Sequence, residues 1–212
     1  MNRLAHLLRA QSEKLNLFSA KDRELLEEKH LPDALAVLEC WAPKAGEKVI
    51  DVGTGGGLPG LALAEALPEL FFTLVDARLK KVEAVMEVAE ALVLNNVEGV
   101  AERFEDLAHT SGYRGGFDIA LARAVAPLPV LLEYVAGFLK VDGLFYAWKG
   151  PDAPLELEAA AGAMKLLGME FIKTHEYHLP SCEKRCILIF QKKKSLSKEY
   201  PRRTGIPKQK PL

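Results

Sequence analysis

Residues 51–60 of the chain read DVGTGGGLPG, and this stretch decides how the rest of the sequence is interpreted. It follows Lys48–Val52, which predicts a short strand, and it precedes Leu61–Leu67, which predicts a helix. Four glycines within five positions allow positive φ angles and a close approach of the backbone to a ligand. Open α/β sheets bind ligands where a strand ends and a helix begins. The stretch therefore predicts a ligand-binding loop.

Strand and helix patterns alternate along most of the chain. The predicted strands are 48–52, 71–75, 97–101, 117–122, 143–148, 170–178 and 186–191, and the predicted helices between them are 61–67, 80–94, 128–139 and 154–167. Such alternation favours a parallel sheet with crossover helices on both faces. Only a hairpin-length connection joins the last two strands, so they should be antiparallel. The predicted fold is α/β and Rossmann-like, with a mostly parallel seven-stranded sheet that ends in an antiparallel hairpin.

An N-terminal helical extension precedes the sheet. Apolar residues recur at helical spacing from Leu4 to Leu38, with a turn near Asn16 and a helix cap at Ser19 or Asp22. We expect three parts: a helical extension at 1–45, the α/β domain at 46–191 and a basic tail at 192–212.

The glycine loop fits two cofactor classes. Gly55, Gly57 and Gly60 match the G-x-G-x-x-G pattern of dinucleotide sites. However, Pro59 removes an N–H where a pyrophosphate needs donors, and Asp51 would bring a carboxylate toward a phosphate. S-adenosylmethionine has no phosphate and carries an ammonium group, so neither objection applies to it. The sequence favours S-adenosylmethionine, the cofactor of class I methyltransferases, with a nicotinamide cofactor as the alternative.

Residues that follow the second and third strands are candidates for the rest of this pocket. Asp76 could accept hydrogen bonds from both hydroxyls of a ribose, or it could cap the following helix. Glu105 could accept from an adenine amino group, and Phe104 could offer its backbone or ring. A solvated Glu105 is the alternative.

Two cations end the next two strands. Arg123 and Lys149 have no competing carboxylate beside them in the sequence, so they suit a substrate rich in phosphate. The alternative for each is an ion pair with a nearby acid. The motifs typical of methylation at exocyclic amines or at pyrimidine carbon-5 are absent. A ring nitrogen such as guanine N7 has a free lone pair and no proton, so positioning alone can serve it and no catalytic base is identified.

Charge is distributed unevenly along the chain. From Gln191 to Leu212 there are eight lysines and arginines against Glu199 alone, so this strip carries +7 and the remainder −8 of the net −1. The strip could contact RNA phosphates, or it could be a disordered tail that aids solubility.

The hydrophobic segments and the cysteines indicate the cellular compartment. No stretch approaches the ~20 apolar residues of a membrane span, and Arg3, His6 and Arg9 interrupt any secretory pattern. We therefore expect a cytoplasmic protein. Its three cysteines predict neither a disulfide framework nor a metal site.

Several motifs in order resemble the RsmG (GidB) family of bacterial small-subunit rRNA methyltransferases. They are the glycine stretch, DARLKK at 76–81, ARAVA at 122–126, WKG at 148–150, KHLPDAL at 29–35 and YPRRTGIP at 200–207. The resemblance implies methylation of guanosine N7 in 16S rRNA, with no membrane and no obligate protein partner. It implies that the donor pocket includes Gly53, Leu58, Asp76, Ala77, Arg78, Phe104, Glu105 and Arg123. Candidate RNA contacts are His30, Lys149, Arg202 and Arg203.

Two other functions stay open. A nicotinamide-dependent oxidoreductase would bind NAD. A noncatalytic RNA-binding assembly factor would keep the fold, although the intact glycine loop and Asp76 count against it.

Overall fold

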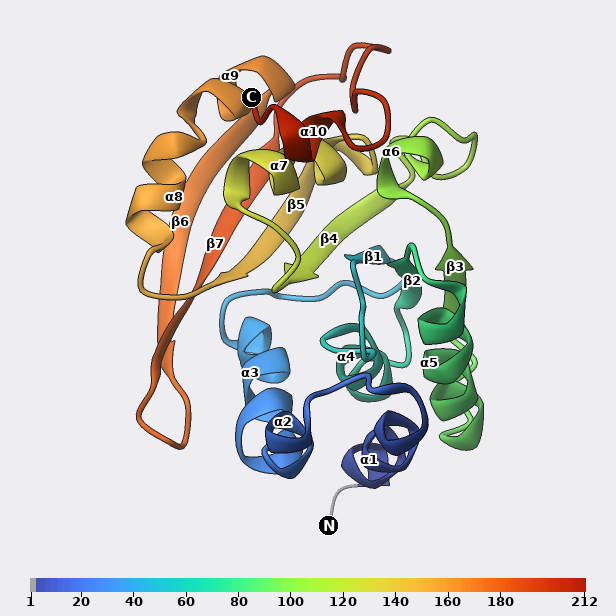
Figure 1. Cartoon of the computed structure of the whole chain (residues 1–212). Coiled ribbons are helices and arrows are strands. Elements are labelled where there is room, and N and C mark those ends of the chain that lie inside the picture. Colours follow the sequence, from blue (N-terminus) through green and yellow to red (C-terminus); the bar gives the residue numbers. More distant parts are fainter. Residues whose placement is uncertain (1–2) are drawn as a thin grey trace.

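The computed structural model describes residues 3–212, and its central feature is a seven-stranded sheet of order β3-β2-β1-β4-β5-β7-β6 (Figure 1). Strands β1 to β5 are parallel, and β7 pairs antiparallel with both β5 and β6. The predicted fold class is therefore confirmed. The strands are β1 Lys48–Val52, β2 Phe71–Asp76, β3 Val97–Ala101, β4 Phe117–Arg123, β5 Leu139–Lys149, β6 Met169–His178 and β7 Lys184–Lys192.

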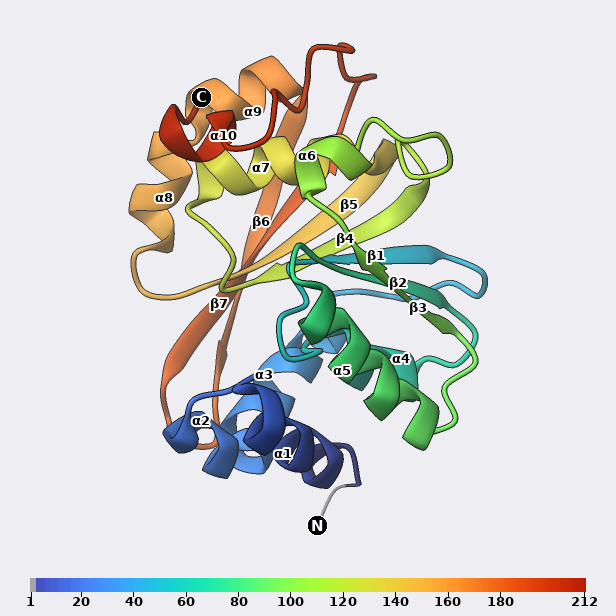
Figure 2. The same cartoon turned by 45° about the vertical axis from the view of Figure 1, so that its right-hand side comes forward.

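Helices cover both faces of the sheet (Figure 2). One face carries α1 Arg3–Leu15, α2 Ala20–Glu24, the π-helical turn η1 Leu26–His30, α3 Leu31–Leu35, the 3₁₀ turn η2 Ala36–Glu39, α4 Gly60–Ala66 and α5 Leu79–Ala91. The other face carries α6 Phe104–Leu107, α7 Leu128–Ala136, α8 Ala153–Ala159, α9 Ala161–Leu167 and α10 Ile206–Gln209.

The two helical layers bury two separate apolar clusters. In β1, Val49 belongs to one cluster, whereas Ile50 and Val52 belong to the other. A strand buried on both faces is typical of the centre of a parallel sheet. Leu8 of α1 and Leu26 of η1 lie in the same cluster as Val49. The N-terminal helices therefore share the core of the α/β domain.

Most predicted elements are present, with shifted boundaries. Ser19 caps α2 by accepting a hydrogen bond from Asp22 N at 3.1 Å, so of the two candidate caps, Ser19 and Asp22, the first is the one present. Strand β5 begins at Leu139 because this residue already pairs with Phe117 of β4. The predicted helix at 154–167 is broken at Ala160 into α8 and α9. The short helices α6 and α10 were not predicted.

The basic tail is folded against the body, which contradicts the alternative interpretation of it as a disordered segment. Lys192 is 4% exposed, and its ammonium donates to the carbonyls of Ala136 at 2.7 Å and Leu139 at 2.6 Å. Burial lowers the pKa of Lys192 to about 8. The Arg114 guanidinium donates to the carbonyls of Ser197 at 3.0 Å and Tyr200 at 2.9 Å. Of the positive charge counted in this strip, that of Lys192 lies inside the protein, whereas Lys193, Lys194 and Lys198 are exposed.

Arg202 is the main ionic attachment of this tail. Its guanidinium contacts both carboxylate oxygens of Glu133, at 2.7 to 3.2 Å, and its backbone N–H donates to Glu133 at 2.8 Å. Glu133 lies in α7 and is fully buried. The Arg202 side chain therefore neutralises a buried carboxylate, and its contact with RNA stays a prediction. Arg203 beside it is exposed.

Among residues 3–212, no helix combines the length and apolar character needed to cross a membrane.

Replacing Arg202 by methionine should destabilise the fold by roughly 3 kcal/mol, because it leaves the buried Glu133 carboxylate without its partner. Urea unfolding measures this loss. The matched control is Arg203→Met, which removes an exposed neighbour of the same type and should change stability little. Equal unfolding midpoints for the two variants would contradict the structural role of Arg202.

Candidate active site

A cleft of about 1110 Å³ opens at the carboxyl ends of β1, β2, β4 and β5. Its volume suits a small-molecule cofactor together with part of a larger substrate. Of the predicted donor residues, those that line it are Gly53, Leu58, Asp76, Ala77, Arg78, Phe104 and Arg123. Of the predicted RNA contacts, His30 and Lys149 line it. Glu105, Arg202 and Arg203 lie outside this lining.

The glycine loop leaves no space for a side chain at its first glycine. Gly53 has φ +82°, and its N–H donates to the carbonyl of Val75 at 2.9 Å. A Cβ on Gly53 would lie 2.6 Å from Cγ2 of Val125. The loop backbone at Gly53 is therefore held directly against the β4–α7 loop.

Asp51 lies beneath the loop, away from the cleft. It is fully buried, and its carboxylate accepts from Gly60 N at 3.0 Å. Burial raises the pKa of Asp51 to about 6, although the Thr54 hydroxyl and the Gly60 N–H act in the opposite direction. The prediction that Asp51 faces the ligand is wrong, because its carboxylate binds the first N–H of α4 instead.

This arrangement gives a second reason why the loop disfavours a pyrophosphate. Leu61 N donates to the carbonyl of Gly57 at 2.8 Å, Gly60 N is taken by Asp51, and Pro59 has no N–H. A dinucleotide site needs free N–H groups at the start of this helix. The start of α4 offers none at these three positions.

Asp76 connects two loops at the cleft wall. Its carboxylate accepts from Gly55 N at 3.2 Å and from Arg78 N at 2.9 Å. Arg78 is the residue before α5, so Asp76 braces the turn rather than capping the helix itself. Binding of ribose hydroxyls by Asp76 stays a prediction.

Arg123 is engaged by an acid that lies far away in sequence. Its guanidinium donates to Asp33 of α3 at 2.8 Å, and both side chains are largely buried. Asp33 also accepts from the hydroxyl of Tyr177 at 2.5 Å, and its backbone carbonyl accepts from Trp148 Nε1 at 2.7 Å. Burial, then the negative charge of Asp33, raises the pKa of Tyr177. The expectation that no carboxylate competes for Arg123 is therefore wrong.

Lys149 has the same kind of partner. Its ammonium lies 2.6 Å from a carboxylate oxygen of Glu156 and donates to the carbonyl of Ala126 at 3.0 Å. The same Glu156 oxygen accepts from Leu128 N at 2.7 Å. For Lys149, too, the ion pair predicted as the alternative is the one present. The sequence could have indicated Glu156 as this partner, because it lies seven residues after Lys149 in a predicted helix.

His30 lies between two charged groups on the N-terminal side of the cleft. Its Nε2 is 3.2 Å from Asp22, and its Nδ1 is 3.4 Å from a guanidinium nitrogen of Arg123. Burial and then the Arg123 charge lower the pKa of His30, so the ring is neutral at pH 7. It packs against Phe18 with ring centroids 5.8 Å apart. Phe18, which also lines the cleft, was not predicted as a site residue.

Phe104 and Glu105 point in different directions. Phe104 lines the cleft and packs against Tyr134 at 5.3 Å between ring centroids. Glu105 is 4% exposed, and its carboxylate accepts from Gly205 N in the tail at 2.9 Å. The placement of Glu105 favours a role in holding the tail over a contact with adenine.

Among residues 3–212, no three histidine, cysteine, aspartate or glutamate side chains are grouped so that they could hold a metal ion.

Solved structures identify the class to which this fold belongs. An S-adenosylmethionine-dependent methyltransferase from Methanosarcina mazei superimposes with a TM-score of 0.56 at 15% identity, over 71% of this chain and 94% of the other. A variant of the 16S rRNA (adenine(1408)-N(1))-methyltransferase from Catenulisporales acidiphilia also gives 0.56, at 17% identity over 72% and 88%. The fold is that of the class I S-adenosylmethionine-dependent methyltransferases.

Sequence comparison then gives the family. Residues 1–187 match GidB, described as rRNA small subunit methyltransferase G. The Ribosomal RNA small subunit methyltransferase G of Deinococcus radiodurans is 40% identical over 99% of this chain and 83% of its own length. The chain belongs to the rRNA small subunit methyltransferase G family, as the resemblance implied. The nicotinamide-dependent alternative is not favoured.

We expect Gly53→Ala to weaken binding of S-adenosylhomocysteine at least tenfold, because the new Cβ displaces Val125 and the loop that lines the cleft. Calorimetric titration measures this affinity. Gly46→Ala is the matched control, since Gly46 has φ +81° but nothing within 4 Å of the added Cβ. Both variants should lose about 1 kcal/mol or more of stability from backbone strain. Equal donor affinity for Gly53→Ala and wild type would refute the close-packed loop.

The raised pKa of Asp51 predicts a pH-dependent stability. The folded state keeps its proton up to about pH 6, whereas an unfolded aspartate loses it near pH ~4. The unfolding free energy should therefore fall by about 2–3 kcal/mol, relative to Asp51→Asn, as pH rises from 4 to 7. The asparagine oxygen can still accept from Gly60 N–H. Urea unfolding at several pH values tests this, and parallel pH profiles for the two proteins would contradict it.

Proposed function

We propose that this protein transfers a methyl group from S-adenosylmethionine to N7 of a guanosine in 16S ribosomal RNA. The observation that carries the proposal is that one cleft holds both the glycine loop and two ion-paired cations, Arg123 and Lys149. Family membership supports the substrate class, since the relative from Deinococcus radiodurans is named for the small-subunit ribosomal RNA. Because such RNA is made and assembled in the bacterial cytoplasm, we place the protein there.

The residues present fit the methyl donor. Gly53 and Asp76 both line the cleft, where Asp76 places a carboxylate on the wall. Leu58 and Phe104 supply apolar surface beside them. These residues, with Ala77 and Arg78, would hold the donor. When bound, S-adenosylmethionine supplies an electrophilic methyl group on a sulfonium.

The chemistry of N7 explains the ion pairs in the cleft. Guanine N7 has a lone pair and no proton, so no side chain has to remove one, and the protein contributes mainly orientation. Methylation at N7 leaves a positive charge on the purine. A free cation beside it would oppose that charge. Asp33 and Glu156 neutralise Arg123 and Lys149, so these side chains can donate hydrogen bonds without a net repulsive charge.

The comparisons do not favour a noncatalytic assembly factor of the same fold, and the product of the reaction distinguishes that alternative from the proposed function. We expect 16S rRNA from a bacterial strain that lacks its own family member to gain one 7-methylguanosine when this protein is expressed. Borohydride and aniline treatment cleaves RNA at that nucleotide, and primer extension locates the cut. A Gly53→Asp variant serves as the control without donor binding. A modified guanosine that resists this cleavage, or none at all, would refute the proposal.

A further inference from the structure

Within residues 3–212, four of the seven lysine and arginine side chains that line the cleft form ion pairs with acids. Lys29 Nζ lies 2.8 Å from one oxygen of Glu183, and an Arg185 nitrogen lies 2.6 Å from the other. Arg123 and Lys149 have the partners described above. These four cations lie toward the N-terminal helices, β4, β5 and β7. Three acids offset these four cations, so the ion pairs on that side leave one net positive charge.

Three other cations of the cleft lining have no ion pair and no side-chain hydrogen bond within residues 3–212. They are Arg78, Lys81 and Arg103. Arg78 precedes α5, Lys81 lies in its first turn and Arg103 precedes α6. These positions follow β2 and β3, which are neighbours in the sheet. We refer to Arg78, Lys81 and Arg103 as the β2–β3 rim.

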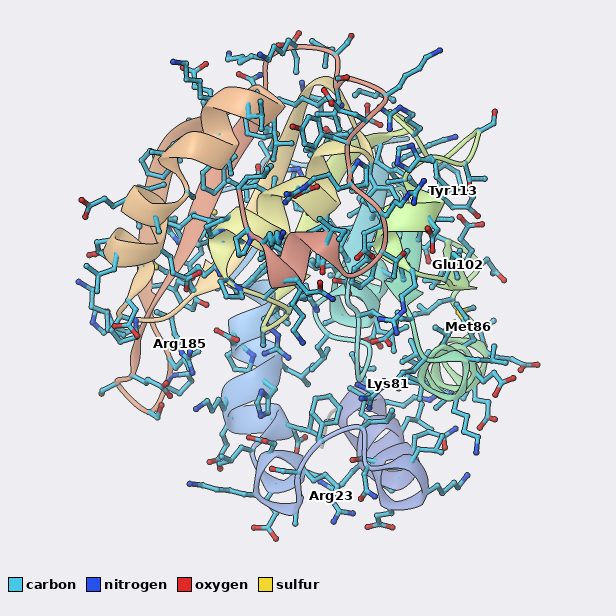
Figure 3. All side chains as sticks on the ribbon, turned by 45° about the horizontal axis from the view of Figure 1, so that its top comes forward. Arg23, Lys81, Met86, Glu102, Tyr113 and Arg185 are labelled. Carbon is cyan, nitrogen blue, oxygen red and sulfur yellow. The ribbon has the colours of Figure 1, made fainter. Side chains whose placement is uncertain are left out.

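The rim is directed toward the cleft. Lys81 Nζ lies 4.0 Å from the position that a Cβ on Gly55 would take, so its ammonium lies beside the glycine loop. Figure 3 shows Lys81 on the loop side of α5 and Arg185 far across the molecule on β7. Glu102, the acid next to Arg103, lies farther out beside β3 (Figure 3) and accepts from the backbone N–H of Arg103 at 2.9 Å.

Three unpaired cations on one rim repel each other unless an anion lies among them. Asp76, the nearest carboxylate of the lining, already accepts two backbone N–H groups. The methyl donor has a single carboxylate, which can neutralise only one of the three rim cations. A chain of phosphates supplies several anions at regular spacing. We propose that Lys81 and Arg103 of the β2–β3 rim bind phosphates of the RNA strand on either side of the target nucleotide, with Arg78 left to the donor.

This inference rests on the proposed function and makes it more specific. It replaces the tail and Arg202 as the main electrostatic contact with RNA, since the tail is docked on α7. Each phosphate that a protein cation neutralises releases counterions, so the affinity falls with salt in proportion to the number of contacts. The change in salt dependence when rim cations are removed therefore reports the phosphates that the rim holds.

The test compares two double variants that each remove two cations. Lys81→Gln with Arg103→Gln changes the rim but spares Arg78, which is assigned to the donor. Lys198→Gln with Lys208→Gln is the matched control on exposed positions of the tail. Binding to a 16S rRNA transcript is measured over a series of salt concentrations. The rim variant should reduce the slope of log K against log salt by about 1.5, whereas the control should leave it within error.

Affinity for S-adenosylhomocysteine and the urea midpoint are measured on the same proteins. Unchanged donor affinity and stability in the rim variant are expected, so that the loss is specific to RNA. The proposal is overturned by an unchanged slope in the rim variant, by an equal loss in the control, or by a loss confined to donor binding. Failure of methylation by the wild type would instead refute the proposed function, because RNA binding is read separately.

Discussion

The buried carboxylate of Asp33 is the interaction on which the geometry of the cleft depends. It joins α3 to Arg123 at the end of β4 and to Tyr177 in β6. A largely buried guanidinium without a partner is strongly unfavourable, so Arg123 can point into the cleft only because α3 supplies this acid. The N-terminal helices are for this reason part of the site. Their apolar residues share one cluster with the sheet. This packing keeps Asp33 beside Arg123 at the end of β4.

The fold could be predicted from the sequence because the patterns that indicate its strands and loops are local. Strand β1 is buried on both faces, and the sequence predicts it as a short strand before the glycine loop. Positive φ at Gly53, Gly55 and Gly57 is a constraint on single residues, and glycine is the residue that satisfies it. The helices α6 and α10 were missed because each has only four residues. Their formation depends on tertiary contacts, such as that between Glu105 and Gly205, rather than on periodicity.

The candidate site was accessible only in part. Gly53 and Asp76 follow from the strand–loop–helix pattern, which brings consecutive loops to one edge of the sheet, whereas Leu58 was implied by the family resemblance. The partner of Arg123 could not be read in this way, because Asp33 is ninety residues earlier and on a different element. A sequence shows that a cation ends a strand, but it does not show whether the cation is paired. The alternative of a disordered tail is wrong for the same reason. Its composition is typical of a solvated segment, but its hydrogen-bond partners, including Glu133, lie in α6 and α7.

The buried position of Glu133 also has a consequence for how the chain folds. As long as residue 202 is unavailable, burial of α7 would place an unpaired carboxylate in an apolar cluster, which costs several kcal/mol. The packing of α7 and the docking of the tail are therefore coupled into one cooperative transition. On a ribosome, a growing chain cannot complete this half of its core before the segment around Arg202 has emerged. Partly synthesised molecules then lack a finished cleft, so the ability to hold RNA and donor arrives only with the full fold.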